Sequence, residues 1–179
     1  MYVGYDESLR PYPNYDGAPV KYIWAGPDLS KWSAPVTVAP GGDPGHVLPH
    51  IIAGSPGNLD MAYWTGQQDG SNIHWYTTIA QIFQGLTKSP SIHQTRVSTI
   101  SSDTGTASVL MGACDQNPQT AGVVNGLVCN RSADVWGIAL TPTCNLTIAW
   151  PVRNNSDTAL EATYATTQTG GTPVCKKLP

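Results

Sequence analysis

Hydrophobic and polar positions alternate in several short segments of the chain, and this alternation predicts β-strands. Residues 59–64 (LDMAYW) and 145–150 (NLTIAW) place apolar side chains at every second position, as a strand with one buried face does. Similar runs recur along the chain, separated by turn residues such as Gly, Pro, Asn and Asp. These runs are 1–5, 20–25, 35–39, 46–54, 73–82, 91–99, 134–140 and 160–168. No convincing helical pattern interrupts them, so the sequence predicts an all-β chain.

A loose internal repeat refines this prediction. Residues 54–64 (GSPGNLDMAYW) and 140–150 (LTPTCNLTIAW) share a turn, Asn-Leu, a polar residue, an apolar residue, Ala and an aromatic residue. Each follows an apolar run, and each precedes a Tyr-bearing run at 73–81 or 160–168. Such a unit has three strands and room for a fourth, and four-stranded units in radial repetition form a β-propeller. A β-sandwich would have similar strands but would give no reason for the repeat.

The stretch 25–38 (AGPDLSKWSAPVTV) resembles a degenerate Asp-box, the turn motif of sialidase-like (BNR-repeat) propellers. Asp28, Trp32, Ser33 and Pro35 match the spacing of the motif, whereas Ser30 replaces its Gly. The resemblance implies a structural hairpin between the third and fourth strands of a blade. Its Asp would bind backbone amides of the turn, and its Trp would be buried in the blade. The alternative is that Trp32 is an isolated core aromatic.

Further segments resemble the same family. Residues 46–64 are similar to an inner strand paired with the second strand of a blade, 129–150 to the pattern of the last blade, and 163–171 to a closing outer strand. The resemblance therefore implies a partial β-propeller of about three four-stranded antiparallel blades within a single unit, 1–179.

The approximate blades are 1–42, 43–100 and 101–179. A propeller has four to eight blades. We therefore expect the chain to be a homo-oligomer or to need the remainder of a longer propeller.

In sialidases of this family an arginine triad clamps the substrate, a Tyr–Glu pair supplies the nucleophile and an Asp is the general acid. This chain has only four Arg and two Glu, and it contains no Arg-Ile-Pro triplet. A complete catalytic set cannot be assigned, so we predict no catalytic residue. The expected function is a non-catalytic propeller segment that binds carbohydrate or protein or has a structural role. The alternative is a part of a glycoside hydrolase of the exo-sialidase type.

The ligand-binding residues implied by the resemblance are Arg131, Asp134 and Trp136. They match the last-blade pattern just before an inner strand, which would direct them to the central channel. The alternative is a local Arg131–Asp134 ion pair that orders a loop.

Composition narrows the function further. Charged residues make up only 12% of the chain, the formal net charge is −3, and the basic residues are scattered. Nucleic-acid binding needs clustered basic side chains, so we expect no nucleic-acid partner. No apolar run is long enough for a membrane span. The N-terminus reads as a strand rather than a secretory signal, which suggests a removed signal or a portion of a longer chain.

The four cysteines, Cys114, Cys129, Cys144 and Cys175, have long spacings without a Cys-x-x-Cys pair. Two disulfides are favoured over a zinc site or four reduced thiols. Sequence proximity and even parity predict the pairs Cys114–Cys129 and Cys144–Cys175.

Three Asn-x-Ser/Thr triplets, at Asn130, Asn145 and Asn154, are N-glycosylation acceptors if the source glycosylates its proteins. Together with the predicted disulfides they favour a secreted, extracellular protein.

Metal and cofactor chemistry is not expected. His46 and His50 lie four residues apart, but in a strand they would share one face about 13 Å apart. Trp64, Trp75 and Tyr76 could form a sugar-stacking platform, although core packing is the favoured interpretation. No dinucleotide or phosphate-binding loop is present.

Overall fold

The computed structural model describes residues 1–7, 18–42, 45–70, 72–99, 123–124, 127–128, 137–153 and 161–175. Every helix or strand element in these ranges is a strand, so the all-β prediction is confirmed. Each predicted strand-like run overlaps one of the observed strands, and β8 and β9 lie in a region for which no strand was predicted. Among the described residues no helix is long and apolar enough to cross a membrane.

Antiparallel pairing of consecutive strands builds three sheets and a short ribbon. The first sheet contains β1 (Tyr2–Asp6), β2 (Val20–Trp24) and β3 (Val36–Ala39). The central sheet contains β4 (His46–Ala53), β5 (Leu59–Asp69), β6 (Asn72–Phe83) and β7 (Ser91–Arg96). The ribbon pairs β8 (Val123–Val124) with β9 (Leu127–Val128). The third sheet contains β10 (Gly137–Leu140), β11 (Leu146–Arg153) and β12 (Glu161–Thr167).

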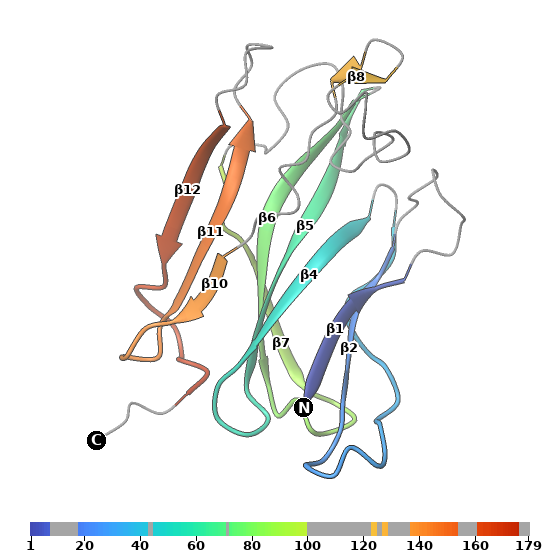
Figure 1. Cartoon of the computed structure of the whole chain (residues 1–179), viewed down its shortest axis with the longest axis vertical. Helices are drawn as coiled ribbons and strands as arrows, with labels where there is room; N and C mark the ends of the chain where they lie inside the picture. Colours follow the sequence, from blue (N-terminus) through green and yellow to red (C-terminus); the bar gives the residue numbers. More distant parts are fainter. Residues whose placement is uncertain are drawn as a thin grey trace.

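The central sheet lies between the two three-stranded sheets (Figure 1). One face of β5, with Leu59, Met61 and Tyr63, packs against the first sheet. The opposite face, with Ala62 and Trp64, packs against the third sheet. Burial of both faces explains why β5 departs from simple alternation and is apolar at most positions from 59 to 64.

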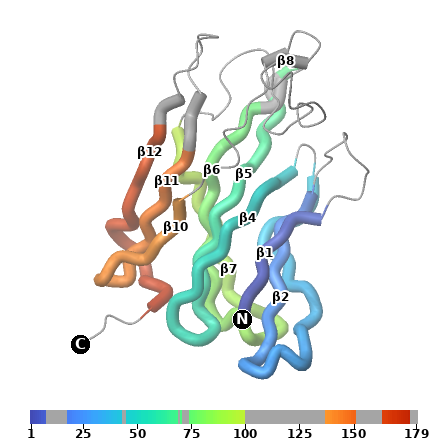
Figure 2. Tube along the Cα trace, in the orientation of Figure 1, coloured from blue at the N-terminus to red at the C-terminus, as the bar shows by residue number. Residues whose placement is uncertain are grey.

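The first strands of the three sheets adjoin one another in chain order. β1 contacts β4, and β4 contacts β10 (Figure 2). Gly4 allows the close approach of β1, because a Cβ at this position would lie 2.9 Å from Met61 Cε. The three consecutive sheets are therefore stacked in sequence order, with their first strands side by side.

The internal repeat corresponds to two equivalent turns, between β4 and β5 and between β10 and β11. The Gly54 amide donates to the Asn58 carbonyl at 2.9 Å, and the Thr141 amide donates to the Asn145 carbonyl at 2.9 Å. The residue before each Asn has a left-handed backbone, with φ 81° at Gly57 and 65° at Cys144. The sequence repeat thus reflects a repeated turn geometry at the start of the second strand.

The expectation of four strands in each sheet is met only by the central sheet. Within the described residues the first and third sheets each have three strands. The three sheets do not close into a barrel.

Candidate functional site

A groove of about 350 Å³ lies between the central and third sheets. Apolar side chains of β6, β11 and the adjoining segments lie along it, and threonine, glutamine and glycine residues complete its lining. The lining residues are Ile79, Gln81, Thr95, Val97, Leu146, Ile148, Thr166, Thr167, Gln168, Thr169, Gly170 and Gly171. None of these residues carries a charge.

Hydrogen bonds within the lining hold the segment after β12 in place. The Gln168 amide group donates to the Gly170 carbonyl at 2.7 Å and accepts from the Leu146 amide at 3.2 Å. Gln81 donates to the Thr172 carbonyl at 3.3 Å. Gly171 has φ 79°, a left-handed conformation that favours glycine. These contacts connect the segment to both sheets that line the groove.

The groove combines an apolar surface with uncharged hydrogen-bonding groups. Such a surface can bind a ligand with apolar faces and hydroxyl or amide groups. Its lining has no carboxylate or imidazole for general acid–base chemistry. The groove therefore has properties of a binding site for an uncharged ligand.

One titratable group, Asp60, is buried in the same face of the central sheet. Asp60 is fully buried and lies opposite Gln81 in the strand register. Burial raises the pKa of the Asp60 carboxyl to about 6, and the Gln81 side chain acts in the opposite direction. Neither carboxylate oxygen has a well-formed hydrogen bond. Asp60 is inaccessible, so we assign it to the core rather than to a ligand.

The ligand-binding residues predicted from the sequence, Arg131, Asp134 and Trp136, lie outside the described residues. The same holds for Asn130 and Asn154.

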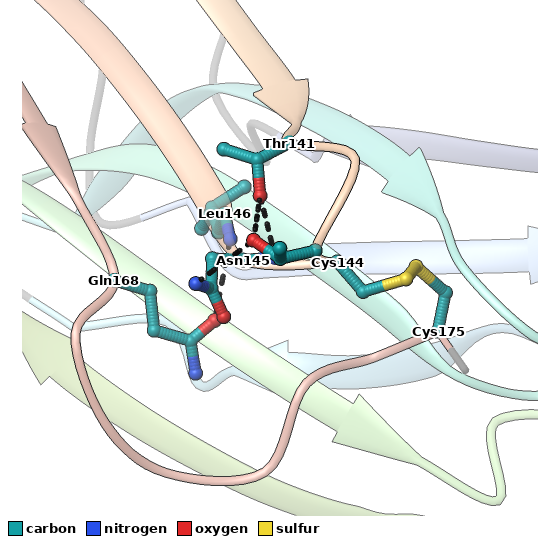
Figure 3. The surroundings of a disulfide bond; sticks show 7 residues. Thr141, Cys144, Asn145, Leu146, Gln168 and Cys175 are labelled. Atoms are coloured by element: carbon teal, nitrogen blue, oxygen red, sulfur yellow. Dashed lines mark hydrogen bonds between the residues drawn. A yellow bond between two sulfur atoms is a disulfide. The ribbon is translucent and has the colours of Figure 1, made fainter. Parts of the chain in front are cut away.

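The predicted Cys144–Cys175 disulfide is confirmed (Figure 3). Cys144 lies in the β10–β11 turn, whereas Cys175 belongs to the segment that follows the groove. Cys114 and Cys129 lie outside the described residues, so their pairing stays a prediction. Asn145, beside Cys144, is only partly buried, and its side-chain amide donates to the Thr143 hydroxyl at 3.3 Å.

The disulfide holds the C-terminal segment against the β4–β5 turn. The Ser55 amide donates to the Val174 carbonyl at 2.9 Å, and Val174 is fully buried. A side chain at Gly54 would overlap the Val174 carbonyl. The segment that borders the groove is therefore held at its C-terminal end by the Cys144–Cys175 disulfide and by the backbone hydrogen bond between Ser55 and Val174.

The turn at 25–33 agrees with the Asp-box expectation in part. Asp28 accepts from the Ser30 amide at 3.3 Å and from the Ser30 hydroxyl at 2.6 Å, as an Asp that orders a turn does. The expectation that Trp32 is buried is wrong, because its side chain is 44% exposed. The turn also joins the second and third strands, not the third and fourth. Trp32 lies opposite Ala25 at the end of the first sheet, on the face turned away from the central sheet.

The aromatic residues considered as a sugar platform do not form one. Trp64 and Trp75 are buried between the central and third sheets, which confirms the core interpretation. Tyr76 is on the opposite face of β6, and the Arg96 guanidinium lies 3.3 Å from the centre of its ring.

The two histidines do not share a face. A bulge between Val47 and His50 shifts the register, so His46 pairs with Thr65 and His50 with Ala62. Positions 62 and 65 of a strand point to opposite faces, and the expectation of a shared face is therefore wrong. The described residues contain no group of three or more His, Cys, Asp or Glu side chains suited to a metal ion.

Sequence reasoning missed the groove. Its polar lining comes largely from residues 166–171 (TTQTGG), which resembled only a closing strand. The groove is formed by β6, β7, β11 and β12 together, and a single segment contains no signal for a space between two sheets.

No family model, curated protein or solved structure matches this chain. The class of the protein is therefore defined by the fold alone: an all-β protein with three stacked antiparallel sheets and an uncharged groove between two of them.

Proposed function

We propose that this chain is a non-catalytic segment of an extracellular, sialidase-like propeller and that it binds uncharged carbohydrate in the groove between β6–β7 and β11–β12. The observation behind this proposal is the lining of the groove. Ile79 and Val97, which are partly buried, offer apolar surface to the faces of sugar rings, and threonine and glutamine groups offer partners to sugar hydroxyls.

The stacking of the sheets supports the propeller part of the proposal. In a propeller the first strands of successive blades surround the axis, and β1, β4 and β10 adjoin one another in this order. The Cys144–Cys175 disulfide supports an extracellular location, because structural disulfides persist in oxidising compartments.

The positions of the acidic side chains support the non-catalytic part. Asp6 accepts from the Leu48 amide at 2.7 Å, Glu7 pairs with Lys21, and Asp28 accepts from Ser30. Asp60 is buried. Each of these four carboxylates has a structural environment, and no two of them are paired in these contacts as the acid and nucleophile of a glycosidase would be.

A titration with uncharged oligosaccharides tests binding. Isothermal calorimetry and ¹⁵N chemical-shift mapping should place the response on residues of β6, β7, β11 and β12. Thr95→Val and Thr166→Val each remove one hydroxyl and should weaken binding by about five- to tenfold, as the loss of one hydrogen bond does. Thr163→Val, outside the groove on β12, is the matched control. A response confined to other residues would contradict the assignment of the groove.

An aryl-sialoside assay distinguishes the enzyme alternative. We expect no turnover above background from the purified chain. Turnover that disappears in Arg131→Ala would support a glycosidase instead.

A further inference from the structure

The outward face of the first sheet exposes adjacent apolar side chains. Gly4 points toward the central sheet, so its neighbours Val3 and Tyr5 point away from it. Val3 is 38% exposed and pairs with Ile23 on β2. Trp32, opposite Ala25, extends the same face beyond β2. Contiguous apolar side chains on a sheet surface mark an interaction site, whereas scattered ones do not.

The charge on this face is already neutralised. Lys21, opposite Tyr5, forms an ion pair with Glu7. Another apolar surface could therefore cover Val3, Ile23 and Trp32 without leaving an unpaired lysine.

The outward face of the third sheet has complementary properties. Pro151, Arg153 and Glu161 share this face toward one end of β11 and β12, and the register places only glycine, alanine and threonine on its remaining described positions. These residues are Gly137, Ala139, Thr147, Ala149, Thr163, Ala165 and Thr167. Packed sheets need large side chains to meet small ones across a gap of about 10 Å. The part of the β10–β12 face that carries glycine, alanine and threonine can thus accept the bulky face of β1–β2.

We propose that two copies of this chain pair head to tail, with the outward face of β1–β2 in one copy on the outward face of β10–β12 in the next. This contact continues the order in which the chain stacks its own sheets. The third sheet of one copy would pack on the free outward face of the first sheet of the next copy.

We expect the head-to-tail contacts to close into a ring of two copies, which is a dimer. A head-to-tail contact either closes or grows into a filament. Two copies supply six sheets, which is within the four to eight blades of propellers. A closed pair buries both contacts, and stable interfaces need about 800 Å² on each partner. The closed pair therefore buries twice the area of a single contact.

Light scattering coupled to size-exclusion chromatography measures the assembly. We expect wild type to have twice the mass of one chain. Val3→Lys places a charge on one face and Ala165→Lys on the other, and each variant alone should have the mass of a single chain. Leu86→Lys is the control, because Leu86 is also exposed but belongs to the β6–β7 loop, and it should remain dimeric. If circular dichroism shows that a variant is unfolded, Trp32→Gln and Ala139→Lys replace it.

A mixture of the two variants tests the head-to-tail geometry. Each retains one intact face, so Val3→Lys labelled with a donor and Ala165→Lys labelled with an acceptor should give energy transfer when mixed. Neither variant should give transfer with itself. A single-chain mass for wild type at all concentrations, a dimer of either variant alone, or no transfer in the mixture would overturn the proposal. These variants leave the groove intact, so the outcome is independent of carbohydrate binding.

Discussion

At the scale of single residues, Asp60 is the group least compatible with its surroundings. It occupies a fully buried position in β5 that an apolar residue could fill. Its pKa is about 6 in the folded protein because burial disfavours the charged form, against 3.8 for an ordinary Asp. The folded state therefore retains a proton that the unfolded state has released between about pH 4 and pH 6. Asp60 makes the fold less stable as the pH rises through this window.

Asp60→Asn should stabilise the protein at pH 7 by about 1–3 kcal/mol and flatten the fall in stability between pH 4 and pH 6. Urea unfolding at several pH values measures both effects. Asp28→Asn is the control. Hydrogen bonds from Ser30 lower the pKa of Asp28, so its carboxylate stabilises the fold at neutral pH and this stabilisation is lost as the pH falls. The pH dependence that Asp28 contributes is therefore opposite in sign to that of Asp60. A wild-type stability that does not change between pH 4 and pH 6 would contradict the burial of a carboxyl at position 60.

Cys144 combines two effects at one position, the disulfide and a left-handed backbone. Cys175→Ser and Cys144→Ala should each cost about 3–4 kcal/mol, the chain-entropy value for a sequence separation of 31. Cys144→Gly also removes the disulfide but relieves the φ of 65°. It should therefore be more stable than Cys144→Ala by about 1 kcal/mol. Equal stabilities of the Gly and Ala variants in urea would show that the turn relaxes when the disulfide is absent.

At the scale of elements, the bulge in β4 determines which side chains face each sheet. Leu48 has φ 53°, a strained value for leucine, and its amide donates to the Asp6 carboxylate at 2.7 Å. The contact joins β1 to β4 at the boundary between the first and central sheets. The bulge thus separates His46 from His50 and connects two sheets.

Asp6→Ala should cost about 1–3 kcal/mol, because the Leu48 amide would lose its acceptor at a partly buried position. Asp6→Asn retains a carbonyl oxygen at this place and should cost less. Urea unfolding compares the two variants. An Asp6→Ala protein as stable as wild type would show that the bulge does not depend on this acceptor.

The exposure of Trp32 changes what its removal should do. Trp32→Ala should cost less than the 3–5 kcal/mol typical of a buried tryptophan, since 44% of the side chain is exposed. Trp64→Ala, at a fully buried position, is the comparison and should show the full loss. Thermal unfolding of both variants measures the difference, and equal losses would indicate that Trp32 is covered in solution.

At the scale of the whole molecule, the central sheet is the layer with both faces covered. β5 and β6 supply side chains to both core clusters, whereas β12 is the edge of the third sheet. Local opening should therefore be easiest in the third sheet and hardest in β5.

Hydrogen exchange measured by NMR should show this order. The hydrogen-bonded amides of β5 should exchange more slowly than those of β12 by a factor of at least about ten. Equal protection in the two strands would mean that the sheets open only as one cooperative unit.

Local patterns in the sequence were enough to predict the strands other than β8 and β9, and the Cys144–Cys175 pair. Alternation and turn residues act over a few positions, so they appear in any short window of the chain. The repeated turn at 54–58 and 141–145 was detectable for the same reason, although Cys144 replaces the Gly57 of the first copy. The buried Trp32 and the shared face of His46 and His50 were wrong, because each depends on contacts that a short window of sequence does not contain. Four strands were found in the central sheet, and in the other two sheets the described residues form three.

The tertiary structure alone decided how the sheets stack, and with it the groove, the buried carboxyl of Asp60 and the free outer faces. Asp60 lies among alternating residues that read as a half-buried strand, yet it is fully buried on the face of β5 that packs against the third sheet. Trp32 has the spacing of a buried motif but lies on a face that none of the other described sheets covers. A sequence pattern shows which positions are apolar, whereas the burial of a position depends on which surface packs against it in the folded chain.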